Sequence, residues 1–432
     1  MDQAARALPG CAEVKSNLGN ALRSRGRVPE ALAACRHAGL PGDAPGCHLP
    51  SVLRLQRLVL TDFRNHAALT WRPAARISVL FGPNGSGKTN LLEAISLLVP
   101  GRGLRGVRNA DLPRREGPGG WAVAGRLMTI LGQTDIGTGT APEGPVERRV
   151  FRLDGAAPRN QAEIGARAAA VWLTPQMDRL FQEGLSGRRR FLDRLVWALE
   201  PNHAREMAAH DAAMSSRNRL LAEGRPRGGG DNAWLGGLED AMARHAVAAT
   251  AARMGLVNRL NAALARGVMG AFPAARIGLV CQIAERLADA PALAVEDWLR
   301  ESLGANRVRD AAAGTAALGA HRTDMTMADA ATGAEAAQAS TGEQKSLLIG
   351  TVLAHAALIG DARGFAPLLL LDEPAVHLDP SRRAALFAAL AELPAQTVIT
   401  GTDAEVFLPL SGHAEALRTA PGELQPDPRF KT

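Results

Sequence analysis

Short apolar stretches bounded by glycine and proline recur through the first part of the chain. Residues 53–60 and 68–71 alternate apolar and polar side chains, and residues 77–81 are almost entirely apolar. Alternation with a period of two is typical of half-buried strands, and a short apolar run between turn residues is typical of a fully buried one. The pattern therefore predicts three successive strands, with further strands at residues 121–130 and 147–153.

A helical pattern follows these strands. From Asp178 to Ala265 the apolar residues recur at a spacing near 3.6, with one break at Gly224–Asn232. Two helices of about thirty residues joined at this break would form an antiparallel hairpin about 45 Å long, at 1.5 Å per residue. The pattern predicts a short helical arm.

Strands and helices alternate again after the arm, which is typical of an α/β fold. Residues 132–145 are rich in Gly, Thr and Pro and predict a loop or a disordered stretch, and residues 319–324 predict a polar turn. The hydroxyl of Ser340 and the carboxylate of Glu343 have the spacing of a capping box. Strands are expected at residues 276–281, 367–371 and 396–400, and helices at residues 295–303, 305–312 and 340–356.

A phosphate-binding loop is indicated between the strand at residues 77–81 and the helix that follows. Glycines let consecutive backbone N–H groups surround a phosphate, and the next helix directs the positive end of its dipole at the same anion. Lys88 would reach the β- and γ-phosphates of ATP, and Thr89 would bind Mg²⁺. A glycine-rich turn is the alternative. The loop consists of Gly82, Pro83, Asn84, Gly85, Ser86, Gly87, Lys88 and Thr89.

Two adjacent carboxylates stand at the end of a second apolar strand. Asp372 and Glu373 follow the leucine run 368–371, and parallel sheets bind ligands at this end of their strands. Carboxylates there would be costly without a cation. We therefore expect Asp372 to hold Mg²⁺ and Glu373 to activate the attacking water as a general base.

The charge of the chain favours an anionic partner. The formal net charge is +7 and the isoelectric point is near 10.0, and nucleic acid is the commonest anionic partner of a basic chain. A coding bias toward arginine contributes, because only Lys15, Lys88, Lys345 and Lys431 are lysines. Two arginine clusters could contact DNA, or else could be solvated surface. They comprise Arg102 and Arg105 in the loop of residues 102–116, and Arg188, Arg189 and Arg190 at the base of the arm.

The first fifty residues differ in character from the rest of the chain. Residues 17–35 resemble one tetratricopeptide repeat, which cannot bury its apolar face alone. Residues 1–50 are therefore expected to be an extension without core function, or alternatively a partner-binding module, that ends in a Gly- and Pro-rich linker. We expect no secretory signal, no apolar run long enough to cross a bilayer, four reduced cysteines and a cytoplasmic location.

Taken together, the motifs resemble the bacterial RecF family of ABC-type ATPases, related to SMC and Rad50-type proteins. The resemblance covers residue 51 to the C-terminus. Its residues are Phe63-Arg64-Asn65, Gly82 to Ile95, Arg188 to Asp193, Gly319 to Asp324, Ser340 to Lys345 and Leu369 to Pro374, with Asp379. Three departures are His66 where Tyr is common, Ala320 where Pro is usual and Gln176 where Glu is usual.

The resemblance implies an α/β ABC-type ATPase head with an inserted helical-hairpin lobe. Its ATP-binding lobe would comprise residues 51–175 and 313–432, and its helical lobe residues 176–312. ATP would bind Gly82 to Asn90 of one protomer, and Ser340 and Gly342 of a second protomer would close over the γ-phosphate in an ATP-dependent homodimer.

The resemblance also implies binding to single-strand/double-strand junctions of gapped DNA, assistance to RecA loading together with RecO and RecR, and slow, DNA-stimulated ATP hydrolysis in DNA repair. The alternatives are an ABC transporter subunit, for which the insertion between Lys88 and Ser340 is too long, and an SMC or Rad50-type protein, for which the arm is too short. A further alternative is a scaffold that binds ATP without hydrolysing it. Such a protein would retain the phosphate loop, so Glu373 is the residue that distinguishes the two.

Overall fold

The computed structural model describes residues 53–129, 131–141, 148–223, 229–267 and 272–430. The expected repeat fragment and linker at residues 1–50 lie outside these ranges. The chain divides into two compact units. The first unit ends at Thr174 and resumes at Ala356, and the second unit is Pro175–His355.

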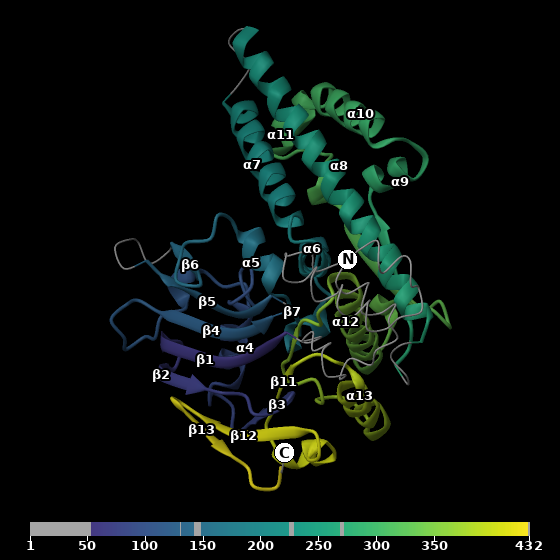
Figure 1. Ribbon diagram of the computed structural model, residues 1–432. Helices are drawn as coiled ribbons and strands as arrows, with labels where there is room; N and C mark the ends of the chain where they lie inside the picture. The colour runs from purple at the N-terminus through teal and green to yellow at the C-terminus, as the bar shows by residue number, and fades with distance from the viewer. Residues whose placement is uncertain (1–52, 130, 142–147, 224–228, 268–271, 431–432) are drawn as a thin grey trace, which may run out of the picture. The chain divides into compact units, whose positions relative to one another are not determined.

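The first unit contains an antiparallel sheet with the strand order β2-β1-β4-β5-β6 (Figure 1). Its strands place apolar side chains on one face, as the alternation in residues 54–60 predicts. The two predicted strands at the start of the domain are confirmed. The bounds are β1 Arg54–Phe63, β2 His66–Trp71, β4 Ala122–Thr129, β5 Gly132–Thr140 and β6 Arg149–Leu153.

The expected loop at residues 132–145 is wrong, because residues 132–140 form β5. This strand pairs with both β4 and β6. It buries Thr134, Ile136 and Thr138 on one face, and the Thr138 hydroxyl donates to the Val150 carbonyl at 2.9 Å. A Cβ on Gly139 would lie 2.4 Å from the Trp121 carbonyl oxygen. Tertiary pairing therefore overrides the low strand propensity of the glycines.

A second sheet of the first unit has the order β13-β12-β3-β11-β10-β7, in which β12, β3, β11, β10 and β7 run parallel. Helix α4 (Lys88–Ser96) contacts strands of both sheets and buries Leu91, Leu92 and Ile95. This unit therefore has the mixed α/β fold expected of an ATPase head. The strands are β3 Ile77–Phe81, β7 Ala170–Leu173, β10 Leu368–Leu371, β11 Thr397–Gly401, β12 Ala414–Ala420 and β13 Glu423–Pro426; helix α5 is Gln161–Arg167 and helix α13 is Pro380–Glu392.

The second unit is built around the antiparallel helices α7 (His203–Ala222) and α8 (Gly229–Ala265) (Figure 1). The expected single helix before the break is wrong, because α6 (Leu185–Leu199) is separate from α7. Glu200 leaves the helical conformation with φ −126° and ψ 89°. The cause is Pro201, whose ring disfavours the helical region for the residue before it.

The remaining elements of the second unit surround this hairpin. Strands β8 (Ala275–Val280) and β9 (Asp324–Asp329) form a two-stranded sheet that contacts α8 and α6. The unit continues to His355, beyond the boundary expected at residue 312, because this sheet packs on the helices of the arm. The helices are α9 Gln282–Asp289, α10 Ala292–Ala305, α11 Arg307–Ala313 and the beginning of α12 Thr341–Arg363.

Helix α12 corrects the expectation that no apolar run is long enough to cross a membrane. It has 23 residues and qualifies by length and composition. However, 78% of its apolar window is buried inside the protein. An apolar helix with this burial is accounted for as a core helix.

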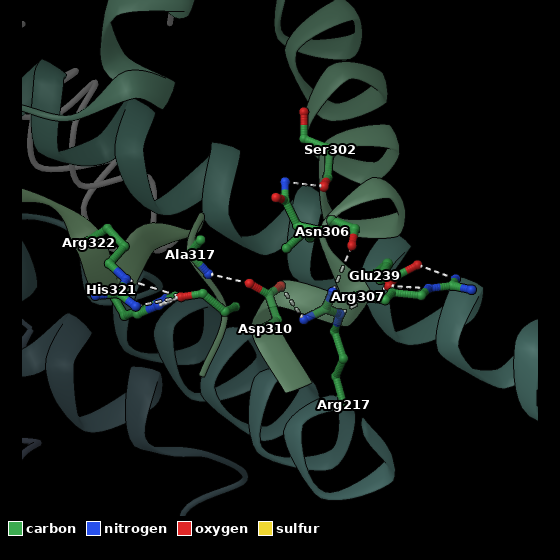
Figure 2. A network of polar contacts seen from close by, with 11 residues as sticks. Arg217, Glu239, Ser302, Asn306, Arg307, Asp310, Ala317, His321 and Arg322 are labelled. Carbon is green, nitrogen blue, oxygen red and sulfur yellow. Dashed lines mark hydrogen bonds and ion pairs between the residues drawn. The ribbon is translucent and has the colours of Figure 1, made fainter. Parts of the chain in front are cut away.

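A buried ionic network joins the two arm helices to the helices beside them (Figure 2). The Arg217 side chain, fully buried on α7, donates to Glu239 of α8 at 3.0 Å and to Asp310 of α11 at 2.8 Å. It also donates to the Leu303 carbonyl at 2.7 Å. Arg307 pairs with the second oxygen of Glu239. Each buried charge therefore has an opposite charge and oriented hydrogen bonds.

Replacing Arg217 with Met should lower the free energy of unfolding by about 3–5 kcal/mol, because it leaves the buried Asp310 carboxylate without its cation. Urea unfolding of the full-length chain, followed by circular dichroism, measures the change. The matched control is Arg244→Met on the same arm, whose ion pair with Asp240 is exposed and should contribute at most about 1 kcal/mol. Equal destabilisation by both substitutions would contradict a special contribution from the buried network.

Candidate nucleotide site

The phosphate loop joins the buried strand β3 to helix α4. Gly82, Gly85 and Gly87 have φ values of 144°, 83° and 106°, which side chains with a Cβ rarely adopt. The Lys88 ammonium lies inside the loop and donates to the carbonyls of Gly82 at 2.7 Å and Pro83 at 2.9 Å. Burial lowers the pKa of Lys88, while the nearby Glu373 and Asp372 raise it. The loop thus holds a desolvated cation where a phosphate would bind.

The sheet order brings the two sequence motifs together. Strand β11 lies between β3 and β10, so the carboxyl ends of all three parallel strands meet at one edge. There the Thr89 hydroxyl donates to Asp372 Oδ1 at 2.9 Å. The Thr400 hydroxyl, at the end of β11, donates to the same oxygen at 2.8 Å. Motifs 283 residues apart therefore share one hydrogen-bonded cluster.

Glu373 directly follows this cluster in an unusual backbone conformation. Its φ is 49°, and a non-glycine residue in this region carries strain of order 1–3 kcal/mol. The Glu373 backbone N–H donates to the Thr400 hydroxyl at 2.9 Å, which helps to hold this conformation. The side chain is half buried next to the phosphate loop lysine. This is the position that a residue acting on a bound phosphate would need.

The residues at this edge fit a magnesium nucleotide. The buried Ser86 hydroxyl has no hydrogen-bond partner among the described residues, so a phosphate oxygen could satisfy it. Thr89 and Asp372 provide the oxygen ligands that Mg²⁺ prefers. The helix that begins at Lys88 adds its dipole to the attraction for the phosphates. ATP and Mg²⁺ are therefore compatible with the donor set.

Asn65 in the β1–β2 turn and His66 at the start of β2 lie against Gly87 of the phosphate loop. The Gly422 N–H donates to His66 Nδ1 at 3.0 Å, so Nε2 carries the proton of the neutral ring. Burial lowers the pKa of His66, which keeps it neutral. A Cβ on Gly87 would lie 2.7 Å from His66 Nε2 and 2.9 Å from Asn65 Nδ2. Gly87 is thus required by contact as well as by φ.

The expected trans-acting residues lie in the second unit, at the start of α12. Ser340 is exposed, and its capping box is confirmed. The Ser340 hydroxyl and N–H donate to Glu343 at 2.7 and 2.9 Å, and the Glu343 N–H donates to the Ser340 hydroxyl at 3.4 Å. The Gly342 carbonyl accepts from Ser346. The start of α12, with the Ser340 side chain, is therefore at the surface.

Comparison with known proteins identifies the family. DNA replication and repair protein RecF of Mesorhizobium japonicum is 46% identical over 380 residues, which cover 88% of this chain and 99% of the relative. The RecF of Rhizobium meliloti is 44% identical over 87% of this chain and all of the relative. This chain belongs to the RecF family.

A solved structure and a shorter family model bear on the fold. The solved structure described as the recombination mediator protein RecF-ATPrS in the RecFOR pathway matches with a TM-score of 0.76 at 21% identity, over 87% of this chain and 98% of that chain. A family model described as AAA domain, putative AbiEii toxin, Type IV TA system, matches residues 77–127. The expectation of a RecF-like ATPase fold is confirmed, and the transporter alternative is set aside.

The arginines predicted for DNA contact differ in their surroundings in this RecF family member. Arg102 and Arg190 are exposed. Arg105 donates to Glu93 at 3.0 Å, and Arg188 forms two hydrogen bonds with Asp324, which raise the pKa of Arg188. Burial and the nearby Arg253 lower the pKa of Arg189. The sequence did not distinguish these environments.

Sequence reasoning missed Thr400 within the site and the contacts of Glu93 beside it. Thr400 joins Asp372 to Glu373, and its only local signal is a hydroxyl at the end of an apolar strand. The Glu93 carboxylate on α4 binds Arg64 and Arg105. Its signal is a carboxylate within the apolar stretch Leu91 to Ile95 of this helix.

Proposed function

We propose that this RecF family member is an ATP-dependent DNA-binding protein of recombinational repair and replication restart. ATP would close two copies of the chain on single-strand/double-strand junctions of gapped DNA, assisting RecA loading with RecO and RecR. Slow, DNA-stimulated hydrolysis would then release the dimer. The observation that supports this function best is the cluster of Thr89, Asp372 and Thr400 beside the phosphate loop.

In this proposal, each group of the site has a role in ATP hydrolysis. Lys88, already desolvated, exchanges the carbonyls of Gly82 and Pro83 for the β- and γ-phosphate oxygens. Thr89 and Asp372 would hold Mg²⁺, which would supply positive charge beside the phosphates. Glu373 accepts the proton of the attacking water as general base. The Thr400 hydroxyl fixes the Asp372 carboxylate and the Glu373 backbone relative to each other, because it donates to one and accepts from the other.

Dimerisation would complete the site. In this chain, Ser340 and Gly342 belong to the second unit and stand at an exposed helix start, so they are available to the γ-phosphate of another copy. Asp379 caps α13 by accepting from the Arg382 N–H at 2.9 Å, in the loop expected near the dimer interface. ATP occupancy would thereby become a signal for closing two protomers.

Replacing Ser340 with Arg should leave ATP binding within about threefold of the parent while abolishing the ATP-dependent dimer, because the added side chain occupies the space needed by the partner's phosphate. Sedimentation with and without ATP measures the dimer, and fluorescent-nucleotide titration measures binding. Ala312→Arg, on the exposed face of α11 in the same unit, controls for the added charge. An ATP-dependent dimer of normal affinity in Ser340→Arg would overturn the proposed trans-acting role.

A further inference from the structure

Glu93 binds two arginines from different segments of the first unit. Its carboxylate is only 1% exposed. It accepts from Arg64 Nε and Nη2, both at 2.8 Å, and from Arg105 Nη1 at 3.0 Å. Arg64 lies in the β1–β2 turn, and Arg105 lies in the loop after α4. A buried carboxylate therefore ties this loop to the turn.

The same contacts continue to the phosphate loop. Arg105 Nη1 also donates to Asn90 Oδ1 at 2.8 Å. Asn90 Nδ2 donates to Asn65 Oδ1 at 2.7 Å, and Asn65 Nδ2 donates to the Gly85 carbonyl at 3.4 Å. Each donor has an acceptor in this sequence of contacts. The path begins at Glu93 and ends on the backbone that would surround the phosphates.

The turn that carries Arg64 is strained. Phe63 pairs with His66, so Arg64 and Asn65 form a two-residue turn, and Arg64 has a φ of 56°. Glycine is favoured at such a position. Arginine persists there because its guanidinium is held by Glu93 and by the Asp111 carbonyl at 2.7 Å. An unfavourable backbone conformation held by side-chain contacts is characteristic of functional sites.

The five arginines of the loop at residues 102–116 separate into two groups. Arg105, Arg108 and Arg114 are paired with Glu93, Asp111 and Asp62 respectively. Arg102 and Arg115 are exposed and have no ion pair among the described residues. Arg115 lines a cavity of about 580 Å³ together with Arg64, Asn90 and Arg105, whose lining also includes Asp111 and Glu116. The guanidiniums of Arg102 and Arg115 are therefore available to an external anion, and Arg115 lies beside the residues tied by Glu93.

We propose that Glu93 is a positioning residue that ties the basic loop to the phosphate loop, so that nucleotide binding places Arg102 and Arg115 on the phosphates of DNA. The proposal rests on the proposed function, because it needs ATP at Lys88 and DNA as the anion. Phosphates at the loop draw Lys88 away from the Gly82 and Pro83 carbonyls. The rearranged backbone at Gly85 then moves Asn65, Asn90 and Arg105 in turn.

This linkage is reciprocal. If nucleotide raises the affinity for DNA by some factor, DNA must raise the affinity for nucleotide by the same factor. We expect a factor of about tenfold, within the range typical of coupled sites. Arg102 and Arg115 should each contribute about one phosphate contact, equivalent to about 0.9 in the slope of log affinity against log salt on duplex DNA.

The test uses the full-length chain, a gapped duplex and a slowly hydrolysed ATP analogue with Mg²⁺. DNA affinity is measured with and without the analogue at several salt concentrations. Glu93→Gln keeps the shape of the side chain but removes the charge, and should bring the ratio of the two DNA affinities to about one while nucleotide affinity without DNA changes by less than about threefold. Arg105→Gln leaves the Arg64–Glu93 pair intact and should have the same effect, so the test survives if Glu93→Gln does not fold.

The salt slopes provide a second measurement. Arg102→Gln and Arg115→Gln should each lower the slope, whereas Arg114→Gln, whose partly buried guanidinium is held by Asp62 at 2.9 Å, should not. A parent protein that shows no nucleotide-dependent DNA binding would refute the proposed function itself. If nucleotide raises DNA affinity in the parent and to the same extent in Arg105→Gln, the positioning role of Glu93 is overturned, while the proposed function stands. Unchanged slopes in Arg102→Gln and Arg115→Gln would overturn their assignment to DNA.

Discussion

Replacing Glu373 with Gln is expected to lower ATP turnover by about 10²–10⁴-fold, the usual contribution of a positioned general base. Gln keeps the size and hydrogen bonding of the side chain but cannot accept a proton from water. The backbone contact that holds Glu373, from its N–H to the Thr400 hydroxyl, does not involve the carboxylate. ATP binding and the strained φ of 49° should therefore persist.

The consequence should be a trapped complex. If hydrolysis releases the dimer, Glu373→Gln should accumulate as an ATP-bound dimer on gapped DNA, visible by sedimentation and by retention of labelled ATP after dilution. Phosphate release under single-turnover conditions measures the chemical step. Glu392→Gln, at the exposed end of α13, is the matched control and should retain parental turnover. Normal turnover in Glu373→Gln would remove Glu373 from the role of base and would favour another water-activating group.

Lys88→Met should weaken ATP binding on the order of 10²–10³-fold, about 3–4 kcal/mol, because a desolvated cation that meets the phosphates is removed. Lys88 is 5% exposed, and the unbranched Met side chain can occupy much of the same space. The fold should survive, since the two carbonyls that Lys88 contacts belong to the loop itself. Titration with a fluorescent ATP analogue measures the affinity.

A second substitution distinguishes charge from geometry at the same position. Lys88→Arg keeps the positive charge, but the planar guanidinium cannot replace a compact ammonium enclosed by loop carbonyls. We therefore expect Lys88→Arg to lose less affinity for ATP than Lys88→Met, but to hydrolyse ATP more slowly than the parent. Undiminished ATP binding in Lys88→Met would refute the assignment of the phosphate loop. Loss of the helical circular dichroism signal would instead indicate misfolding.

Local patterns were sufficient for the elements with strong periodicity. The alternation before the phosphate loop predicted β1 and β2, and the leucine run predicted β10, because burial of one face or of both faces leaves a direct trace in the sequence. The expected loop at residues 132–145 was wrong, since the strand there buries threonines and glycines against its neighbours. The break at Pro201 had a readable signal that the helical periodicity obscured.

In the candidate nucleotide site, too, some residues could be predicted from the sequence and others could not. Spacing alone predicted Gly82 to Thr89, Asp372 and Glu373 as a phosphate and metal site, because a phosphate and its metal require particular donors at particular intervals along the chain. Sequence could not identify Thr400 or the contacts of Glu93, since their partners are distant along the chain and meet only when parallel strands and a helix pack together. It also could not separate paired from unpaired arginines, because pairing depends on which carboxylate the fold brings within reach. The phosphate chemistry was thus present in the order of residues, whereas the groups that align it, and the arginines left without an ion pair among the described residues, were set by packing.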